Sequence, residues 1–234
     1  MKYFIMILFM LFLVTDVFGL GDINNKRLEK YNILGEDILV SDSVSRAECI
    51  VTIMKLIGVT ENHAERYGRA NLDEPIFNDE RDMYKEEKGY IRIAGTSRIA
   101  LRIRERDFFP KRNVTVKECT AFIMRCLESS SPDLEETFLR AVEIGLVFST
   151  DSFYEKSDDD LLPHDFYIIL DRMLDQKRYI YYYEGFHELQ THEAKSVTYL
   201  EYLENRIMLQ KQIRNQIRRN CECIWEPGKD ANKW

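Results

Sequence analysis

The chain has 234 residues, of which 45% are hydrophobic and 31% are charged, and its formal net charge is −7 at pH 7. This length and composition predict one or two globular domains with a core of ordinary size. The negative charge argues against nucleic acid as a partner, because proteins that bind it in bulk carry basic surfaces.

The chain begins with the pattern of a secretory signal peptide. Residues 4–14 are apolar and follow Lys2, and Val17-Phe18-Gly19 supplies small or permissive residues at the cleavage positions. The apolar stretch is short for a membrane span, so we expect residues 1–19 to be a signal peptide. An uncleaved amino-terminal anchor is the alternative. Since no later stretch approaches membrane length, we expect an exported chain with no transmembrane span after cleavage.

Two helix-start signatures stand about seventy residues apart and indicate an internal repeat. Each has the form Ser/Thr-x-x-Glu, the capping box, in which hydroxyl and carboxylate satisfy backbone N–H groups at a helix start. Each is followed at the same offset by a cysteine and then by an apolar run. The residues are Ser45, Glu48 and Cys49 in the first copy and Thr115, Glu118 and Cys119 in the second. We expect the hydroxyls and carboxylates to be structural helix caps.

A weaker third copy covers residues 161–174, where Pro163 stands as a first helical residue in place of a capping hydroxyl. A further helical pattern precedes each helix start, most clearly over residues 89–101 and 134–146. The predicted unit is therefore a helix, a short loop that contains a phenylalanine, and a capped helix.

Several motifs of these repeats are similar to those of a known family. Phe77-Asn78-Asp79 fits a Phe-x-Asp start, Phe109-Pro110 approximates a Phe-x-Pro loop, and residues 44–48 fit a Thr-Arg-Ala-Glu helix start. Over residues 28–175 the pattern resembles the S-layer homology domain, a bacterial surface module usually present in threes. The sequence departs from the family where Val116 replaces the motif arginine in repeat two and residues 163–165 replace Arg-Ala-Glu in repeat three.

The resemblance implies a mainly α fold in which three helix-loop-helix repeats form a pseudo-threefold helical bundle. The expected repeat domain covers residues 20–175, and the repeats lie at about 24–58, 76–128 and 133–175. A segment over residues 176–234 follows, and we expect it to hold a short extended stretch, a long helix over residues 193–220 and a polar tail.

The resemblance also implies a function, which is attachment to the cell wall or cell surface of a bacterium. In the family, grooves between repeats bind anionic polymer linked to peptidoglycan, and a motif arginine can make paired hydrogen bonds to a carboxylate or phosphate. The candidate polymer-binding residues are Arg46, Arg102, Lys111, Arg112 and Lys117. The alternative is a scaffold derived from these repeats that has lost glycan binding and binds a protein through its carboxyl-terminal segment.

The remaining features give no positive sign of chemistry. We expect Cys49, Cys119 and Cys126 to be buried thiols, whereas Cys221 and Cys223 could pair locally, bridge to another chain or stay reduced. His187 and His192 stand five apart, which does not fit the four-residue spacing of the zinc-protease motif. We therefore expect a protein that is not an enzyme and that has no cofactor and no metal.

Overall fold

A computed structural model describes residues 27–31, 33, 42–70, 75–100, 106–177, 180–181, 190–191 and 197–224 of the chain, without some of the side chains beyond residue 208. The predicted signal peptide, Arg102, His187 and His192 lie outside the described residues. The chain divides into two compact units, Met1–Tyr199 and Leu200–Trp234, and each is described by itself.

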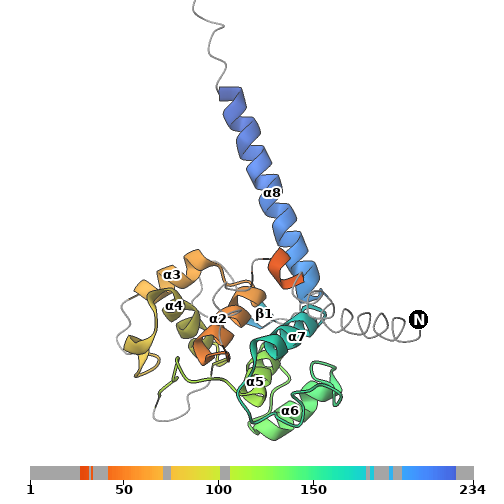
Figure 1. Cartoon of the computed structure of the whole chain (residues 1–234). Helices are drawn as coiled ribbons and strands as arrows, with labels where there is room; N and C mark the ends of the chain where they lie inside the picture. Colours follow the sequence, from red (N-terminus) through yellow and green to blue (C-terminus); the bar gives the residue numbers. More distant parts are fainter. Residues whose placement is uncertain are drawn as a thin grey trace, which may run out of the picture. The chain divides into compact units, whose positions relative to one another are not determined.

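The predicted mainly α class is confirmed (Figure 1). The helices are α2 (Arg46–Ile57), α3 (Glu61–Arg69), α4 (Lys85–Thr96), α5 (Val116–Cys126), α6 (Leu134–Glu143), α7 (Pro163–Leu174) and α8 (Tyr199–Ile224), with the 3-10 turn η2 (Glu80–Asp82). Residues 27–30 are also helical. Two short strands, β1 (Ile180–Tyr181) and β2 (Gln190–Thr191), pair antiparallel within the stretch that was expected to be extended.

Both capping boxes are present at the starts of α2 and α5. The Ser45 hydroxyl accepts from the Glu48 N–H at 3.2 Å, and the Glu48 carboxylate accepts from the Ser45 N–H at 2.8 Å. Thr115 and Glu118 make the same two bonds at 3.2 and 3.3 Å. The third capped helix, α7, begins at Pro163 as expected.

The residues just before these three helix starts bind one another in a closed ring. The N–H of Val44 donates to the carbonyl of Leu161 at 3.0 Å, that of Val114 to Val44 at 2.9 Å, and that of Leu161 to Val114 at 2.8 Å. All three side chains are fully buried, at 0% exposure. The ring brings the three helix starts to one point at the centre of the unit.

Helices α4 and α6 each pack on the capped helix that precedes them in the order of the predicted repeats. Helix α4 lies beside α2, and α6 lies beside α5 (Figure 1). Arg27, the first of the helical residues 27–30, makes ion pairs to Asp171 at 3.1 Å and Asp175 at 2.7 Å around the end of α7. In terms of the predicted repeats, a helix of repeat two thus packs on repeat one, a helix of repeat three packs on repeat two, and Arg27 joins the start of the unit to α7.

Helix α3 was not predicted, since only Ala64 and Tyr67 of its nine residues are buried and its apolar pattern is weak. It packs closely on α4 at Gly89, where an added Cβ would come within 1.7 Å of the Ala64 carbonyl oxygen. Arg92 of α4 donates to the Glu80 carboxylate at 2.7 Å and to three carbonyls at the end of α3. This buried arginine fixes α3 and η2 to the repeat.

The second unit consists of most of α8 and the residues after it. The structure corrects the expectation for Cys221 and Cys223, which lie within α8 and not in a polar tail. Helix α8 begins at Tyr199 rather than near residue 193, and Tyr199 itself belongs to the first unit, where its hydroxyl donates to the Cys126 carbonyl at 3.4 Å. Among the described helices, none has the length and apolarity needed to cross a membrane.

Candidate functional site

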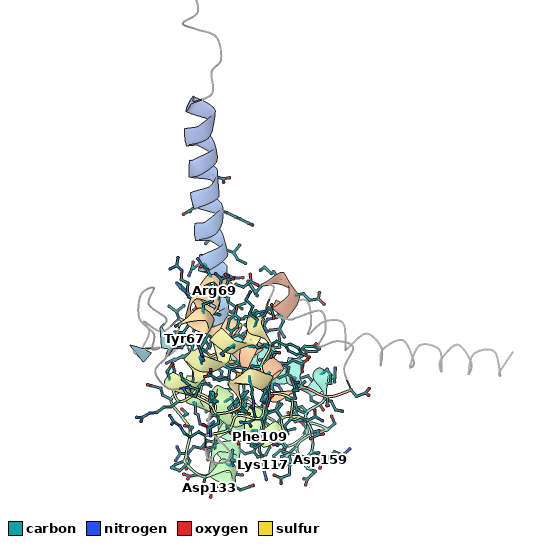
Figure 2. All side chains as sticks on the ribbon, turned by 90° about the vertical axis from the view of Figure 1, so that its left-hand side faces the viewer. Tyr67, Arg69, Phe109, Lys117, Asp133 and Asp159 are labelled. Atoms are coloured by element: carbon teal, nitrogen blue, oxygen red, sulfur yellow. The ribbon has the colours of Figure 1, made fainter. Side chains whose placement is uncertain are left out.

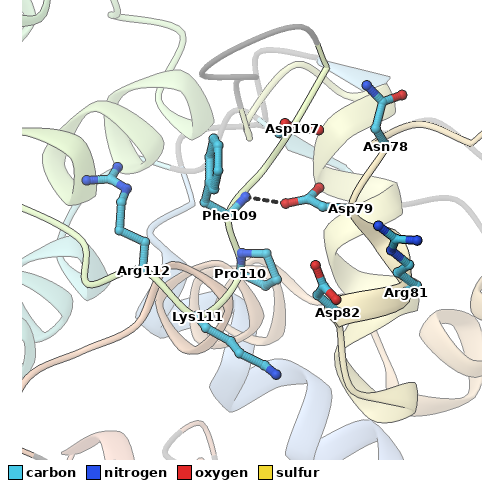
Figure 3. Close-up of a pocket in the computed structure, with 9 residues that line it drawn as sticks. All are labelled: Asn78, Asp79, Arg81, Asp82, Asp107, Phe109, Pro110, Lys111 and Arg112. Carbon is cyan, nitrogen blue, oxygen red and sulfur yellow. Dashed lines mark hydrogen bonds between the residues drawn. The ribbon is translucent and has the colours of Figure 1, made fainter.

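A pocket with a volume of about 580 Å³ lies between the segment that contains η2 and the loop of repeat two (Figure 3). The loop supplies residues from Asp107 to Arg112, and the facing segment supplies residues from Asn78 to Asp82. The lining residues are Asn78, Asp79, Arg81, Asp82, Asp107, Phe109, Pro110, Lys111 and Arg112. Two of the predicted polymer-binding residues, Lys111 and Arg112, therefore line one pocket. Residues of the Phe77-Asn78-Asp79 and Phe109-Pro110 motifs line the same pocket.

The loop that forms one wall of this pocket is held by two hydrogen bonds to the side chain of Asp79. The Asp79 carboxylate accepts from the N–H groups of Phe108 at 2.9 Å and Phe109 at 2.6 Å, and Figure 3 shows the second of these bonds. Phe109 has a φ of +57°, an uncommon value for a residue with a side chain. Its ring is 36% exposed. Asp79 therefore fixes a strained turn that presents an aromatic ring at the pocket.

The same loop also covers the start of α2. The carbonyl of Arg112 accepts from the Arg46 N–H at 2.9 Å, and the carbonyl of Pro110 accepts from the Ala47 N–H at 3.0 Å. In the next repeat, the carbonyl of Ser157 accepts from the Lys117 N–H at 3.0 Å. The donors at the start of α2 are therefore used by the protein itself, so they are not available to an anion.

Arg46, the residue expected to contact the polymer, is buried at 2% exposure. Its Nε donates to the Phe108 carbonyl at 2.8 Å, and its Nη1 lies 3.1 Å from the Glu118 carboxylate. The guanidinium stands 4.9 Å from the centre of the Phe108 ring. Burial lowers the pKa of Arg46, with the Glu118 carboxylate opposing that shift. The structure therefore corrects the expected role: Arg46 links repeats one and two internally instead of lining an open groove.

Lys117 is also engaged by the protein, as its position one residue away from the motif arginine would allow. Its ammonium pairs with Glu135 at 2.6 Å and Asp158 at 2.8 Å, and its side chain is 13% exposed. Figure 2 shows Lys117 at the same end of the unit as Phe109 and Asp159. The hydrogen bonds that its ammonium donates to Asp158 and Glu135 raise the pKa of Lys117. These two ion pairs join repeats two and three and neutralise the charge of the Lys117 ammonium.

The exposed cations of the pocket differ in how strongly the protein holds them. Arg112 pairs with Glu118. Lys111 makes no ion pair within the described part of the chain, and its ammonium lies 5.9 Å from the Tyr84 ring centre. Arg81 is exposed and makes no ion pair with a described residue. Sequence reasoning missed Arg81, although it stands two residues after the Phe77-Asn78-Asp79 motif.

A second cavity, of about 420 Å³, lies among α2, α3 and α4. It is lined by Val51, Lys55, Glu61, Asn62, Glu65, Lys85, Glu86, Glu87 and Tyr90, and none of these was a predicted polymer contact. Its carboxylates do not make a metal site, since the residues that the structure describes contain no group of three side chains that could hold an ion. The first pocket is therefore the candidate site.

Nothing among the protein-family models, the curated proteins or the solved structures matches this chain. The similarity to S-layer homology repeats accordingly remains a prediction from the motifs. The candidate site is defined by its own geometry, in which a partly exposed phenylalanine, three cations and three aspartates surround a pocket at the loop of repeat two.

Proposed function

We propose that the chain is an exported, non-catalytic protein of a bacterial cell surface that binds anionic secondary wall polymer through its S-layer-homology-like repeats. The observation that carries the proposal is the pocket of about 580 Å³ at the repeat-two loop. This volume lies within the range of pockets that enclose small ligands or parts of larger ones. The polymer would enter from the solvent side, next to Lys111 and Arg81.

The chemistry of the lining supports an acidic sugar as ligand. Lys111 and Arg81 carry charges that no described carboxylate neutralises in an ion pair, so a carboxylate or phosphate of the polymer can pair with them. The exposed ring of Phe109 offers an apolar face on which a sugar can lie. Asp82 and Asp107 also line the pocket, and they disfavour an anion that does not contact the cations directly.

In this proposal Arg46 has a different role from the one that the motif suggests. Its bond to the Phe108 carbonyl holds the loop residue that precedes Phe109. Arg46 is therefore a positioning residue for the pocket, and the polymer contacts are Lys111, Arg112 and Arg81. Arg102, which lies outside the described residues, stays a candidate contact.

One observation favours the alternative, a repeat scaffold that binds another protein. Arg46 and Lys117 both form ion pairs between repeats. This arrangement is expected where the charged residues of the repeats serve only to stabilise the packing of one repeat on another. In that case the partner would bind the carboxyl-terminal segment, where α8 offers a helix of 26 residues.

Co-sedimentation with cell walls tests the proposal. The protein without its predicted signal peptide, residues 20–234, is mixed with intact walls and with walls stripped of secondary polymer by acid. We expect binding to intact walls only, and at least a tenfold loss of affinity in Lys111→Glu, since the exchange places a carboxylate where the anion binds. Lys156→Glu is the matched control, because it makes the same charge change on an exposed lysine of the repeat-three loop.

The outcomes separate the two candidate functions. Binding to intact walls that Lys111→Glu leaves unchanged contradicts the pocket as the polymer site. Absence of binding to either wall preparation contradicts polymer binding and leaves the protein scaffold. That scaffold is then tested with a chain that ends at residue 208, which keeps the buried Tyr199 contact and lacks the rest of α8.

A further inference from the structure

Cys49 and Cys119 occupy the same position in repeats one and two, four residues after the capping hydroxyl. Both side chains are fully buried, at 0% exposure. Repeat three has Phe166 at the corresponding position, and this ring is fully buried as well. The two thiols thus belong to the central core beneath the ring of backbone hydrogen bonds.

The ring sets how the two helices approach each other. The bond between the Val114 N–H and the Val44 carbonyl, at 2.9 Å, joins the chain just before α5 to the chain just before α2. Cys49 and Cys119 each stand five residues beyond that bond, on helices that are in contact. Burial raises the pKa of Cys49, and the neighbouring Cys119 thiol raises it further.

We propose that Cys49 and Cys119 are joined by a disulfide in the exported protein, where it fixes repeat one to repeat two at the centre of the bundle. The pair stands at equivalent, fully buried positions on two helices that are in contact and whose starts are joined by a backbone hydrogen bond, which is the placement that a disulfide between them requires. The proposal rests on the export part of the proposed function only for its compartment, since disulfides persist in oxidising surroundings.

The reaction is thiol–disulfide exchange. The two thiols reduce the disulfide of an oxidant of the thiol–disulfide oxidoreductase or glutathione class, which leaves as two thiols, and the Cys49–Cys119 bond forms through a mixed disulfide. Two protons and two electrons pass to the oxidant, so the step balances. Because both thiols are buried in the folded chain, the exchange takes place before folding is complete.

Cys126 cannot pair with Cys119. It lies seven residues beyond Cys119 on α5, about 10 Å along the helix axis at a rise of 1.5 Å per residue. That separation exceeds the span that a disulfide bridges, which is below about 7 Å between Cα atoms. A bond within α5 is thus excluded, and the mass-spectrometric test below separates Cys119 from Cys126 as the partner of Cys49.

The test is oxidative refolding of the full chain with Cys221→Ser and Cys223→Ser, which removes the thiols of α8 from exchange. After refolding from denaturant in a glutathione redox buffer, the free thiols are alkylated and the chain is digested. We expect mass spectrometry to find the peptides of Cys49 and Cys119 joined, and Cys126 alkylated. We also expect the oxidised protein to unfold at a higher urea concentration than the reduced protein, because the bond closes a loop of about seventy residues in the unfolded chain.

Two controls keep the result interpretable. Cys126→Ala should retain both the joined peptides and the shift in the urea midpoint, whereas Cys119→Ala should lose both. The proposal is overturned if Cys49 and Cys119 are alkylated in the refolded chain that keeps both cysteines. An oxidised protein that unfolds at a lower urea concentration than the reduced protein overturns it as well. Since this readout uses no cell wall and no export, its failure is distinct from a failure of polymer binding.

Discussion

At the scale of single residues, Arg46 carries the connection between repeats one and two. Its guanidinium donates to the buried Phe108 carbonyl and pairs with Glu118, so its removal leaves a buried acceptor without a donor. We expect Arg46→Ala to lower the free energy of unfolding by roughly 3 kcal/mol, the usual scale for breaking a buried charged contact. Urea denaturation followed by circular dichroism measures it.

Arg46→Lys separates charge from geometry at this position. An ammonium cannot reproduce the two fixed directions of the guanidinium, so lysine should recover only part of the loss. Lys111→Ala is the control, since an exposed lysine without an ion pair should change stability by no more than about 0.5 kcal/mol. If Arg46→Ala were as stable as that control, the internal role assigned to Arg46 would be wrong.

Asp165 occupies in repeat three the position that Glu118 occupies in repeat two, three residues after the helix cap. It lacks the ion pair that Arg46 gives to Glu118. Repeat two has Val116 where repeat one has Arg46, and within the described chain no ion pair or hydrogen bond satisfies the Asp165 carboxylate. Burial raises the pKa of Asp165, with smaller contributions from its charged neighbours. This carboxylate therefore costs stability when it is ionised.

We expect Asp165→Asn to stabilise the fold at neutral pH, by on the order of 1 kcal/mol, because it removes a charge that burial disfavours. The raised pKa means that the folded chain takes up the proton at a higher pH than the unfolded chain. The wild type therefore gains stability as pH falls through that range, and the difference between the two proteins shrinks. Urea midpoints measured from pH 7 downward test this, and a difference independent of pH would contradict it.

At the scale of elements, the closest packing in the first unit is that of α3 on α4. A Cβ at Gly89 would lie 1.7 Å from the Ala64 carbonyl oxygen, with backbone on both sides of the contact. We expect Gly89→Ala to destabilise the protein by roughly 1–3 kcal/mol, although alanine favours helix more than glycine does. Faster amide hydrogen exchange in α3 would locate the effect, and Glu86→Ala, on the exposed face of α4, is the control.

The elements also show how far the sequence allows prediction. The capped helices followed from side chains that act within four residues, and Ser45, Glu48, Thr115 and Glu118 form both predicted boxes. Helix α3 was missed, since its position depends on a close backbone contact at Gly89 and not on an apolar stripe. The internal contacts of Arg46 were missed for a similar reason, because its partners, Phe108 and Glu118, are more than sixty residues away in the chain.

At the scale of the whole molecule, the ring of Val44, Val114 and Leu161 makes the three repeats depend on one another. Each of the three residues donates to one neighbour and accepts from the other, so no repeat can leave without breaking two bonds. The packing of helices between the predicted repeats adds to this, because α4 and α6 pack on the capped helices that precede them. A single repeat would leave its buried face exposed to water.

This dependence predicts how the ring amides exchange with solvent. If the ring opens only when the repeats separate, the N–H groups of Val44, Val114 and Leu161 should all exchange with one free energy, equal to that of global unfolding. Hydrogen exchange measured by NMR at low urea concentrations gives that free energy for each amide. The amide of Asp159 in the repeat-three loop donates only to the nearby Lys156 carbonyl, at 2.9 Å, so a local opening frees it; it should exchange faster and serves as the internal reference. A ring amide that exchanged by a smaller opening would mean that its repeat unfolds independently, and the bundle would then be a chain of separable units instead of a closed assembly.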